Sequence, residues 1–341
     1  MKLLVIRFSA LGDVAMTIPV IYSVANRYPD LNITVLSKQF VSPLFTNCPK
    51  NVTFRGIDLS QYKGINGLYR LFRELKKEQF DAVADLHDVL RSMILRIFFK
   101  LSGTQTAHID KGRAEKKALT RINHKIIKPL RTSFEHYADV FKALGYPVEI
   151  KFDSIYKGKG DAELFKSIAN LDKKNHWIGF APFAAHKGKV LPIETVKLLI
   201  DKLAANPKNQ IFLFGGGEKE KIQLEILAGD SEQVTAVAGK LKMNGELALM
   251  SYLDVLVSMD SANMHLASLV GTPVISVWGA THPYAGFMGW NQKQENAVQI
   301  DLPCRPCSIF GNKPCHRKDY ACLYKIQTDT ILQKINHIIE S

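Results

Sequence analysis

The stretch Met259-Asp260-Ser261-Ala262-Asn263-Met264-His265-Leu266-Ala267 lies between two apolar runs, 253–258 and 272–279. This order predicts a strand, a tight turn, a helix and a second strand. Asp260 and Ser261 then stand at the carboxyl end of a parallel strand, the edge where open α/β sheets bind ligands. Ser261 is a candidate cap, and the helix N-terminus would attract an anion. A sugar diphosphate suits this pattern, whereas a plain helix cap is the simpler alternative.

The alternation of strands and helices continues in both directions from this stretch. Strands are predicted at 2–7, 32–36, 52–55, 81–86, 105–109, 177–181, 210–214, 234–237, 255–258 and 274–278. Helices are predicted at 14–28, 65–79, 134–144, 192–203, 218–227, 245–251, 261–269 and 328–339. Such alternation predicts parallel sheets with helices on both faces. A less regular stretch, 150–172, contains the predicted linker between two domains, 1–155 and 156–341.

Composition indicates a globular protein without a membrane span. The chain has 341 residues, of which 46% are hydrophobic and 23% charged, as in ordinary soluble domains. No apolar run approaches the roughly 18 residues that a spanning helix needs. The first residues read as a strand rather than a signal peptide, so we expect a cytoplasmic protein.

Positive charge is concentrated in one part of the chain. The net charge is +13, and residues 91–131 hold eleven Lys or Arg against Asp110 and Glu115. A basic patch of this kind favours a polyanionic partner. The apolar run 93–99 beside it favours the inner-membrane surface over nucleic acid, for which interleaved aromatic residues would be expected. A solvated face next to a buried helix is the alternative.

The first loop, Arg7-Phe8-Ser9-Ala10-Leu11-Gly12-Asp13, follows the first strand and opens a helix. It has one glycine, so it is neither a dinucleotide fingerprint nor a P-loop. Asp13 either caps the helix or acts as a general base on an acceptor hydroxyl. The helix N-terminus favours the ionised carboxylate and makes it a weak base. A weak base suffices where proton transfer follows departure of the leaving group.

These motifs resemble those of the ADP-heptose:lipopolysaccharide heptosyltransferases, the family 9 glycosyltransferases with the GT-B fold. The likeness rests on residues 9–14 with Thr17-Ile18-Pro19, and on residues 260–267 with Gly271-Thr272-Pro273 and Gly279-Ala280-Thr281. It implies an α/β protein of two doubly wound Rossmann-like domains facing each other across a cleft. Residues 1–155 would bind the acceptor and 156–341 the nucleotide sugar. The implied reaction moves a heptose from ADP-heptose to a lipid A–core acceptor, with inversion and no required cofactor.

The resemblance also implies roles for single residues. Asp13 matches the family's proposed base. Lys189, in Lys-x-x-Pro, matches the lysine that binds the donor phosphates, with Lys187 as a fallback. The hydroxyl residues often found at Ala184 and Ala185 are missing here. The remaining donor contacts fall on Glu218 for the ribose, Leu241 for the adenine, Asp260 for the sugar hydroxyls, Ser261 and Ala262 for the phosphates, and His265 nearby.

Acceptor contacts are predicted from the N-terminal half of the chain. Ser9 and Gly12 shape the Asp13 loop, and His87 and His136 are candidate acceptor contacts. Packed structural roles for both histidines are an equal alternative. Basic side chains suited to acceptor phosphates are Arg113, Lys116 and Lys117.

Four of the five cysteines cluster as Cys304-x2-Cys307-x7-Cys315-x6-Cys322. This spacing resembles a structural zinc site. Free thiols in a reducing compartment are the other interpretation, and neither gives a metal a part in catalysis. Arg305 and Lys313 in the same loop are also candidates to approach the cleft.

Three other functions fit the same residues. The enzyme could use another nucleotide sugar, or it could be a nucleotide-sugar epimerase or hydrolase on the same fold. A non-catalytic sugar-binding protein at the membrane surface is the third, although Asp13 together with 260–265 disfavours it.

Overall fold

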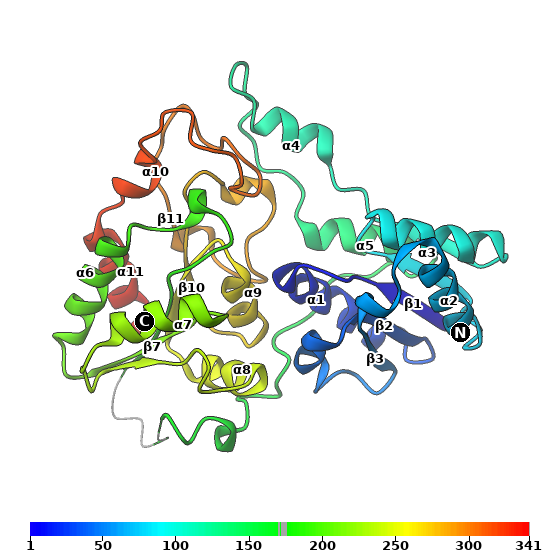
Figure 1. Cartoon of the computed structure of the whole chain (residues 1–341), viewed down its shortest axis with the longest axis horizontal. Coiled ribbons are helices and arrows are strands. Elements are labelled where there is room, and N and C mark those ends of the chain that lie inside the picture. Colours follow the sequence, from blue (N-terminus) through cyan, green and yellow to red (C-terminus); the bar gives the residue numbers. More distant parts are fainter. Residues whose placement is uncertain (170, 172–175, 341) are drawn as a thin grey trace. The chain divides into compact units, whose positions relative to one another are not determined.

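The computed structural model describes residues 1–169, 171 and 176–340 (Figure 1). Packing divides the chain into two compact units. The first comprises Met1–Gly112 and Arg131–Ile155, and the second comprises Arg113–Leu130 and Tyr156–Ser341. Residues 113–130 therefore pack with the second half of the chain, although the sequence placed them in the first. In the described part of the chain, no helix has the length and apolar character needed to cross a membrane.

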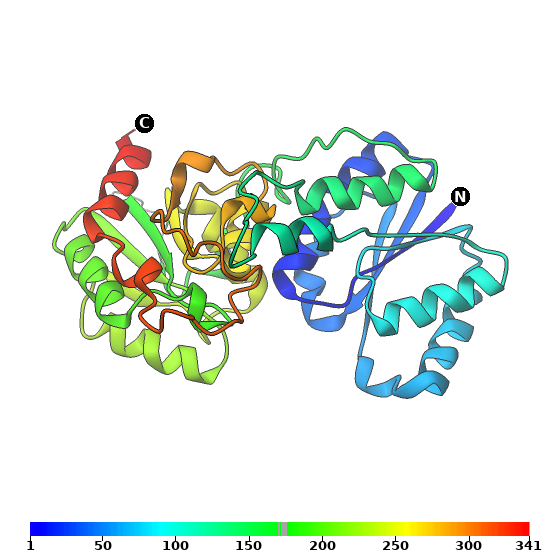
Figure 2. The same ribbon diagram turned by 90° about the horizontal axis from the view of Figure 1, so that it is seen from above.

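The first unit is built on a five-stranded parallel sheet, ordered β3-β2-β1-β4-β5. Its strands are β1 (Lys2–Ile6), β2 (Asn32–Lys38), β3 (Val52–Ile57), β4 (Ala82–Asp85) and β5 (Gln105–His108). Its helices are α1 (Leu11–Arg27), α2 (Gly64–Lys76), α3 (Leu90–Leu101) and α5 (Ser133–Ala143). Helices α2 and α3 pack together, as do α1 and α5 (Figures 1 and 2). Leu4 and Ile6 of β1 share a core with Leu71 and Leu95.

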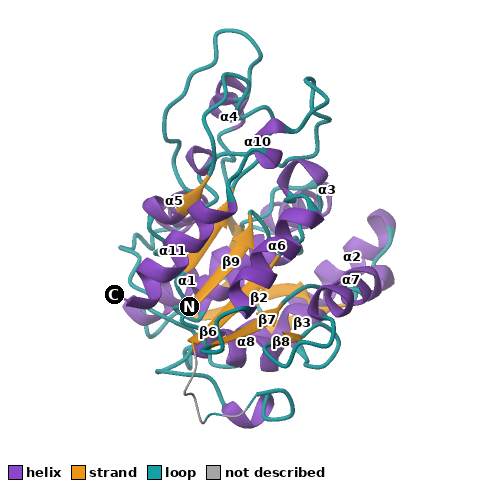
Figure 3. Ribbon diagram, turned by 90° about the vertical axis from the view of Figure 1, so that its left-hand side faces the viewer, coloured by secondary structure: helices purple, strands orange, loops and turns teal. Residues whose placement is uncertain are grey.

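The second unit has a six-stranded parallel sheet, ordered β11-β10-β9-β6-β7-β8. Its strands are β6 (His176–Ala181), β7 (Asn209–Leu213), β8 (Val234–Ala236), β9 (Val255–Met259), β10 (Val274–Val277) and β11 (Ala297–Val298). Its helices are α4 (Arg113–Leu119), α6 (Ile193–Ala204), α7 (Glu218–Ala228), α8 (Met243–Tyr252), α9 (Ala262–Leu269), α10 (Ala321–Tyr324) and α11 (Thr328–Glu340). Figure 3 shows the strands flanked by helices.

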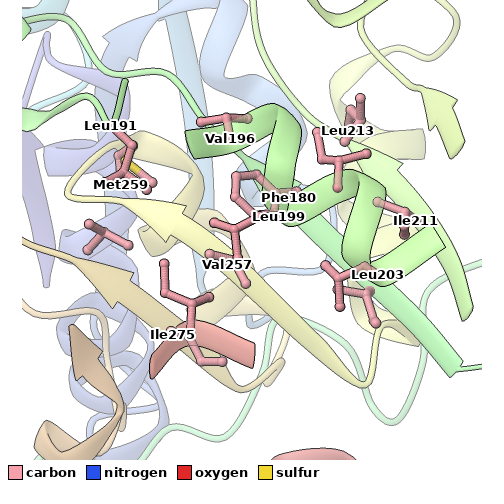
Figure 4. Close-up of a cluster of buried hydrophobic side chains, with 14 of the residues drawn as sticks. Phe180, Leu191, Val196, Leu199, Leu203, Ile211, Leu213, Val257, Met259 and Ile275 are labelled. Atoms are coloured by element: carbon pink, nitrogen blue, oxygen red, sulfur yellow. The ribbon is translucent and has the colours of Figure 1, made fainter. Parts of the chain in front are cut away.

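Branched apolar side chains explain why the central strands of this second sheet are buried on both faces. Phe180 of β6, Val257 of β9 and Ile275 of β10 pack against Leu199 of α6 in one cluster (Figure 4). Ile331 from α11 belongs to the same cluster, so the closing helix packs an apolar face into this core. The rigid core fixes where each strand ends, and the polar residues that follow the strands take their positions from it.

Candidate functional site

In the first unit, the turn from β1 into α1 carries a carboxylate, Asp13, that forms an ion pair with Arg7. Helix α1 begins at Leu11, so Asp13 lies in its first turn and accepts a hydrogen bond from the Ala10 N–H at 3.1 Å. The same oxygen, Oδ2, lies 2.7 Å from an Arg7 guanidinium nitrogen. The Asp13 side chain is 37% exposed while that of Arg7 is 8% exposed. Asp13 therefore presents a stabilised carboxylate that a hydroxyl can reach from solvent.

Arg7 is held in place by groups distant in the sequence. Its guanidinium donates to the Leu86 carbonyl at 2.6 Å and lies 5.8 Å from the centre of the Tyr137 ring. Burial raises the pKa of Tyr137 to about 12, so its ring stays neutral beside the cation. Sequence reasoning missed both Arg7 and Tyr137. The available signal was an arginine ending an otherwise apolar strand, where a charge needs a partner.

His87 lies at the carboxyl end of β4, next to the same turn. Its Nδ1 accepts from the Phe8 N–H at 3.4 Å, which leaves the proton on Nε2, 3.5 Å from Ser9 Oγ. Burial, followed by the nearby Arg7 charge, lowers the pKa of His87 to about 4. His87 is therefore a neutral donor at pH 7. Asp85 fixes its backbone by accepting the His87 N–H at 3.0 Å.

The depressed pKa of His87 predicts a loss of stability in acid. An unfolded histidine titrates near 6.5, so the unfolded chain takes up the proton first as the pH falls from 6.5 to 4. The stabilisation that comes from keeping His87 neutral is fully present above pH 6.5, and it is lost as the pH falls from 6.5 to 4. After a discount for solvent screening, the wild type should lose about 2 kcal/mol more than His87→Gln between pH 7 and 4.5. Urea unfolding of both proteins at the two pH values measures this, and parallel losses would contradict it.

The other residues predicted to contact the acceptor lie in three different helices. Gly12 is buried inside α1, and His136 is buried in α5 one residue before Tyr137. The residues proposed for acceptor phosphates are in α4 of the second unit, whereas Asp13 belongs to the first. Lys116 there lies 4.6 Å over the ring of Phe287. The acceptor roles of these residues stay predictions.

In the second unit, Asp260 and Lys189 form a nearly buried ion pair. Lys189 Nζ lies 2.9 Å from Asp260 Oδ2, and the two side chains are 15% and 5% exposed. Asp260 directly follows β9, and Lys189 ends the short helical turn Lys187–Lys189 after β6. Ser261 is the N-cap residue of α9, as predicted, but its side chain makes no capping hydrogen bond among the described residues. Its hydroxyl lies 3.3 Å from Ser258 Oγ.

Close backbone packing holds the Lys189 turn. The Gly188 carbonyl accepts from the Ala280 N–H at 2.7 Å. A Cβ added at Gly311, whose φ is +73°, would lie only 2.6 Å from Lys189 Cγ. Arg305 is buried and donates to the carbonyls of Trp278 and Thr281 at 3.0 and 2.9 Å. Arg305 therefore supports the segment that carries Ala280 and is not a ligand-facing cation.

The other donor candidates follow neighbouring strands. Glu218 is the first residue of α7 after β7, and its side chain is 77% exposed. Leu241 is half-buried between β8 and α8, and His265 is buried in α9. Because β9, β6, β7 and β8 are adjacent and parallel, the residues after them share one edge of the sheet. Lys187, the alternative candidate for the phosphate-binding lysine, places its Nζ 5.0 Å from the centre of the Tyr320 ring.

The four clustered cysteines, for which the sequence leaves a structural zinc and free thiols open, are free thiols in this structure. Cys304, Cys307, Cys315 and Cys322 line one small cavity. Burial raises the pKa of Cys322 to about 11, so this thiol is protonated at neutral pH when no metal is bound. Across residues 1–169, 171 and 176–340, no three His, Cys, Asp or Glu side chains are grouped to hold a metal.

The model of glycosyltransferase family 9 (heptosyltransferase) matches residues 68–317, most of the chain. The chain belongs to glycosyltransferase family 9. The predicted resemblance is therefore confirmed, and this family 9 protein is a glycosyltransferase.

Two curated relatives of this family 9 protein are heptosyltransferases. It is 25% identical over 298 residues to lipopolysaccharide heptosyltransferase 3 of Escherichia coli, covering 85% of each chain. It is 27% identical over 292 residues to the lipopolysaccharide core heptosyltransferase OpsX of Haemophilus influenzae, covering 83% of this chain and 80% of the relative.

Solved structures show the same fold. The E. coli ADP-heptose lipopolysaccharide heptosyltransferase II matches with a TM-score of 0.74 at 18% identity, over 100% of this family 9 protein and 99% of that chain. The E. coli heptosyltransferase WaaC with ADP matches with a TM-score of 0.70 at 18% identity, over 99% and 100%. The predicted GT-B class is confirmed.

Proposed function

We propose that this glycosyltransferase moves a heptose from ADP-heptose to a lipopolysaccharide inner-core acceptor, with inversion. The curated relatives support the sugar and the acceptor, and the ADP named with the WaaC structure supports the nucleotide. Within the chain, the single observation that carries the proposal is the Lys189–Asp260 pair at the ligand-binding edge of the second sheet. It joins a phosphate-binding cation to a carboxylate suited to sugar hydroxyls.

The second unit would hold the donor. Lys189 turns from Asp260 to the diphosphate, while Asp260 accepts from sugar hydroxyls. The backbone N–H groups of Ser261 and Ala262, at the start of α9, bind phosphate oxygens. Glu218 accepts from both ribose hydroxyls and Leu241 packs on adenine, with His265 nearby. Because Lys189 supplies positive charge at the leaving diphosphate, the reaction uses no bound metal.

The first unit would prepare the acceptor. The acceptor oxygen attacks the anomeric carbon, and the bond from that carbon to the diphosphate oxygen breaks on the opposite face. Asp13 takes the hydroxyl proton late in this step, and Arg7 stabilises its carboxylate beforehand. The neutral His87, with its Nε2 proton near Ser9, offers a donor to a further acceptor hydroxyl. The products are the inverted glycoside and ADP.

A thermal-shift screen of nucleotide sugars tests the donor. ADP-heptose at about 100 times its Kd should stabilise the protein by about 2.7 kcal/mol through mass action. ADP-glucose and UDP-glucose serve as matched probes of the sugar and the base. A larger shift with either one would reassign the donor.

Product analysis with and without acceptor separates the proposed transfer from other chemistry on this fold. Transfer predicts a heptosylated core oligosaccharide and stoichiometric ADP. Sugar release or isomerisation independent of acceptor would instead indicate a hydrolase or an epimerase. Binding without turnover, for any acceptor extract, would favour a non-catalytic protein.

A further inference from the structure

The segment between the two parts of the first unit, residues 113–130, forms an anchored loop. Figure 1 shows the chain leaving α4 and turning back beside it. The Ile126 N–H donates to the Ala118 carbonyl at 3.2 Å, which closes the turn at its base. Lys125 Nζ donates to the carbonyls of Cys304 and Pro306 at 2.7 and 3.0 Å. The loop is thus fixed to the second unit at its base.

This loop carries large apolar side chains that are exposed to solvent. Ile122 is 81% exposed, Ile126 49% and Ile127 51%. Single exposed aliphatic residues are common on protein surfaces, but three on one short closed loop are not, and clustered exposure indicates an interaction site. Leu119, in the same segment, is fully buried. The isoleucines therefore face away from the packing that fixes the loop.

Basic side chains are interleaved with these isoleucines. Residues 113–130 contain six Lys or Arg against the single acid Glu115, and Lys117, Arg121 and Lys128 are exposed. A surface that matches both features must be anionic outside and apolar inside, which describes a bilayer with acidic headgroups. The segment contains no aromatic residue, so it lacks the stacking surfaces of single-stranded nucleic-acid sites.

We propose that residues 117–128 form a membrane-docking loop, in which Ile122, Ile126 and Ile127 enter an anionic phospholipid surface while Arg121 and Lys128 bind its headgroups. This deepens the proposed function and in part rests on it, since a lipid-linked acceptor is met at such a surface. Docking itself requires neither donor nor catalysis, so it is tested separately.

Vesicle co-sedimentation of the full chain measures docking. Phosphatidylethanolamine vesicles with phosphatidylglycerol should bind the protein, neutral phosphatidylcholine vesicles should not, and high salt should release it. Ile122→Asp should weaken partitioning at least tenfold. Arg121→Gln with Lys128→Gln should also weaken it about tenfold or more, since each basic residue near an anionic surface contributes about fivefold.

Matched controls come from the same unit. Ile226 of α7 is 74% exposed, and Ile226→Asp should bind vesicles as the wild type does. Lys208 is an exposed lysine before β7, and Lys208→Gln should change little beyond its single charge. Equal effects of the control and loop variants would overturn the proposal, as would wild-type binding by Ile122→Asp, which would assign the loop to a protein partner instead.

A second readout keeps the docking test independent of the reaction. Ile122→Trp should show a blue shift of tryptophan emission on adding anionic vesicles, beyond any shift of the wild type. Ile122→Asp should retain turnover on a delipidated core oligosaccharide. Vesicle binding without turnover on any acceptor would defeat the proposed function alone, and turnover without vesicle binding would defeat only the docking loop.

Discussion

A Lys189→Met variant should lose donor binding and, at the same time, lower the stability of the protein. Removal of the Lys189 ammonium group leaves Asp260, whose side chain is 5% exposed, as an uncompensated buried charge. Breaking such a pair costs about 3 kcal/mol, whereas replacing both partners together is often nearly neutral. The loss of one charge-assisted contact to phosphate should weaken ADP-heptose binding about 10- to 100-fold. Urea unfolding and calorimetric titration measure the two effects.

The double variant Lys189→Met with Asp260→Asn separates the two effects. It should recover most of the lost stability because no buried charge remains, yet it should bind ADP-heptose no better than Lys189→Met alone. If binding returned with stability, Lys189 would be a purely structural partner of Asp260.

Lys187→Met is the matched control, because Lys187 lies in the same turn but over Tyr320. It should cost less than about 1 kcal/mol and leave donor affinity near the wild-type value. The reverse outcome, lost binding in Lys187→Met alone, would restore Lys187 as the phosphate ligand.

The fold could be predicted because its signals are local. Apolar runs of strand length alternate with amphipathic segments, and this periodicity alone predicts parallel sheets. Asp260, Glu218 and Lys189 follow strands in the sequence, so the rule that parallel strands present their carboxyl ends at one edge predicts the same edge for all three. The structure adds that Lys189 and Asp260 are paired.

The sequence does not predict contacts between residues that are far apart along the chain. The partners of Arg7 come from residue 86 and from α5. The pairing of β1 with β4 brings residue 86 to Arg7, and the packing of α5 on α1 and β4 brings Tyr137. The neutral state of His87 depends on burial and on that same arginine. The position of residues 113–130 likewise depends on contacts with residues far away in the sequence. One of these is the hydrogen bond from Lys125 to the Cys304 carbonyl.

Asp13→Asn should reduce turnover by about 10²- to 10⁴-fold, the usual contribution of a general base. The amide keeps the shape of the side chain but cannot accept the acceptor proton. Donor binding should stay near the wild-type value, because the proposed donor residues belong to the second unit. The stability cost should be about 1 kcal/mol or less, since Asp13 is 37% exposed. Single-turnover kinetics with saturating donor measures the chemical step.

Glu135→Gln provides the control for a purely structural role of Asp13. Both acids lie in the first turn of a helix of the first unit and accept from the N-cap N–H, Glu135 from Thr132 at 2.6 Å. Glu135→Gln therefore removes a comparable helix interaction without touching the Asp13 turn, and its turnover should remain unchanged. If Asp13→Asn lost stability like Glu135→Gln but kept its rate, Asp13 would be a helix cap, and the acceptor proton would have to leave by another group.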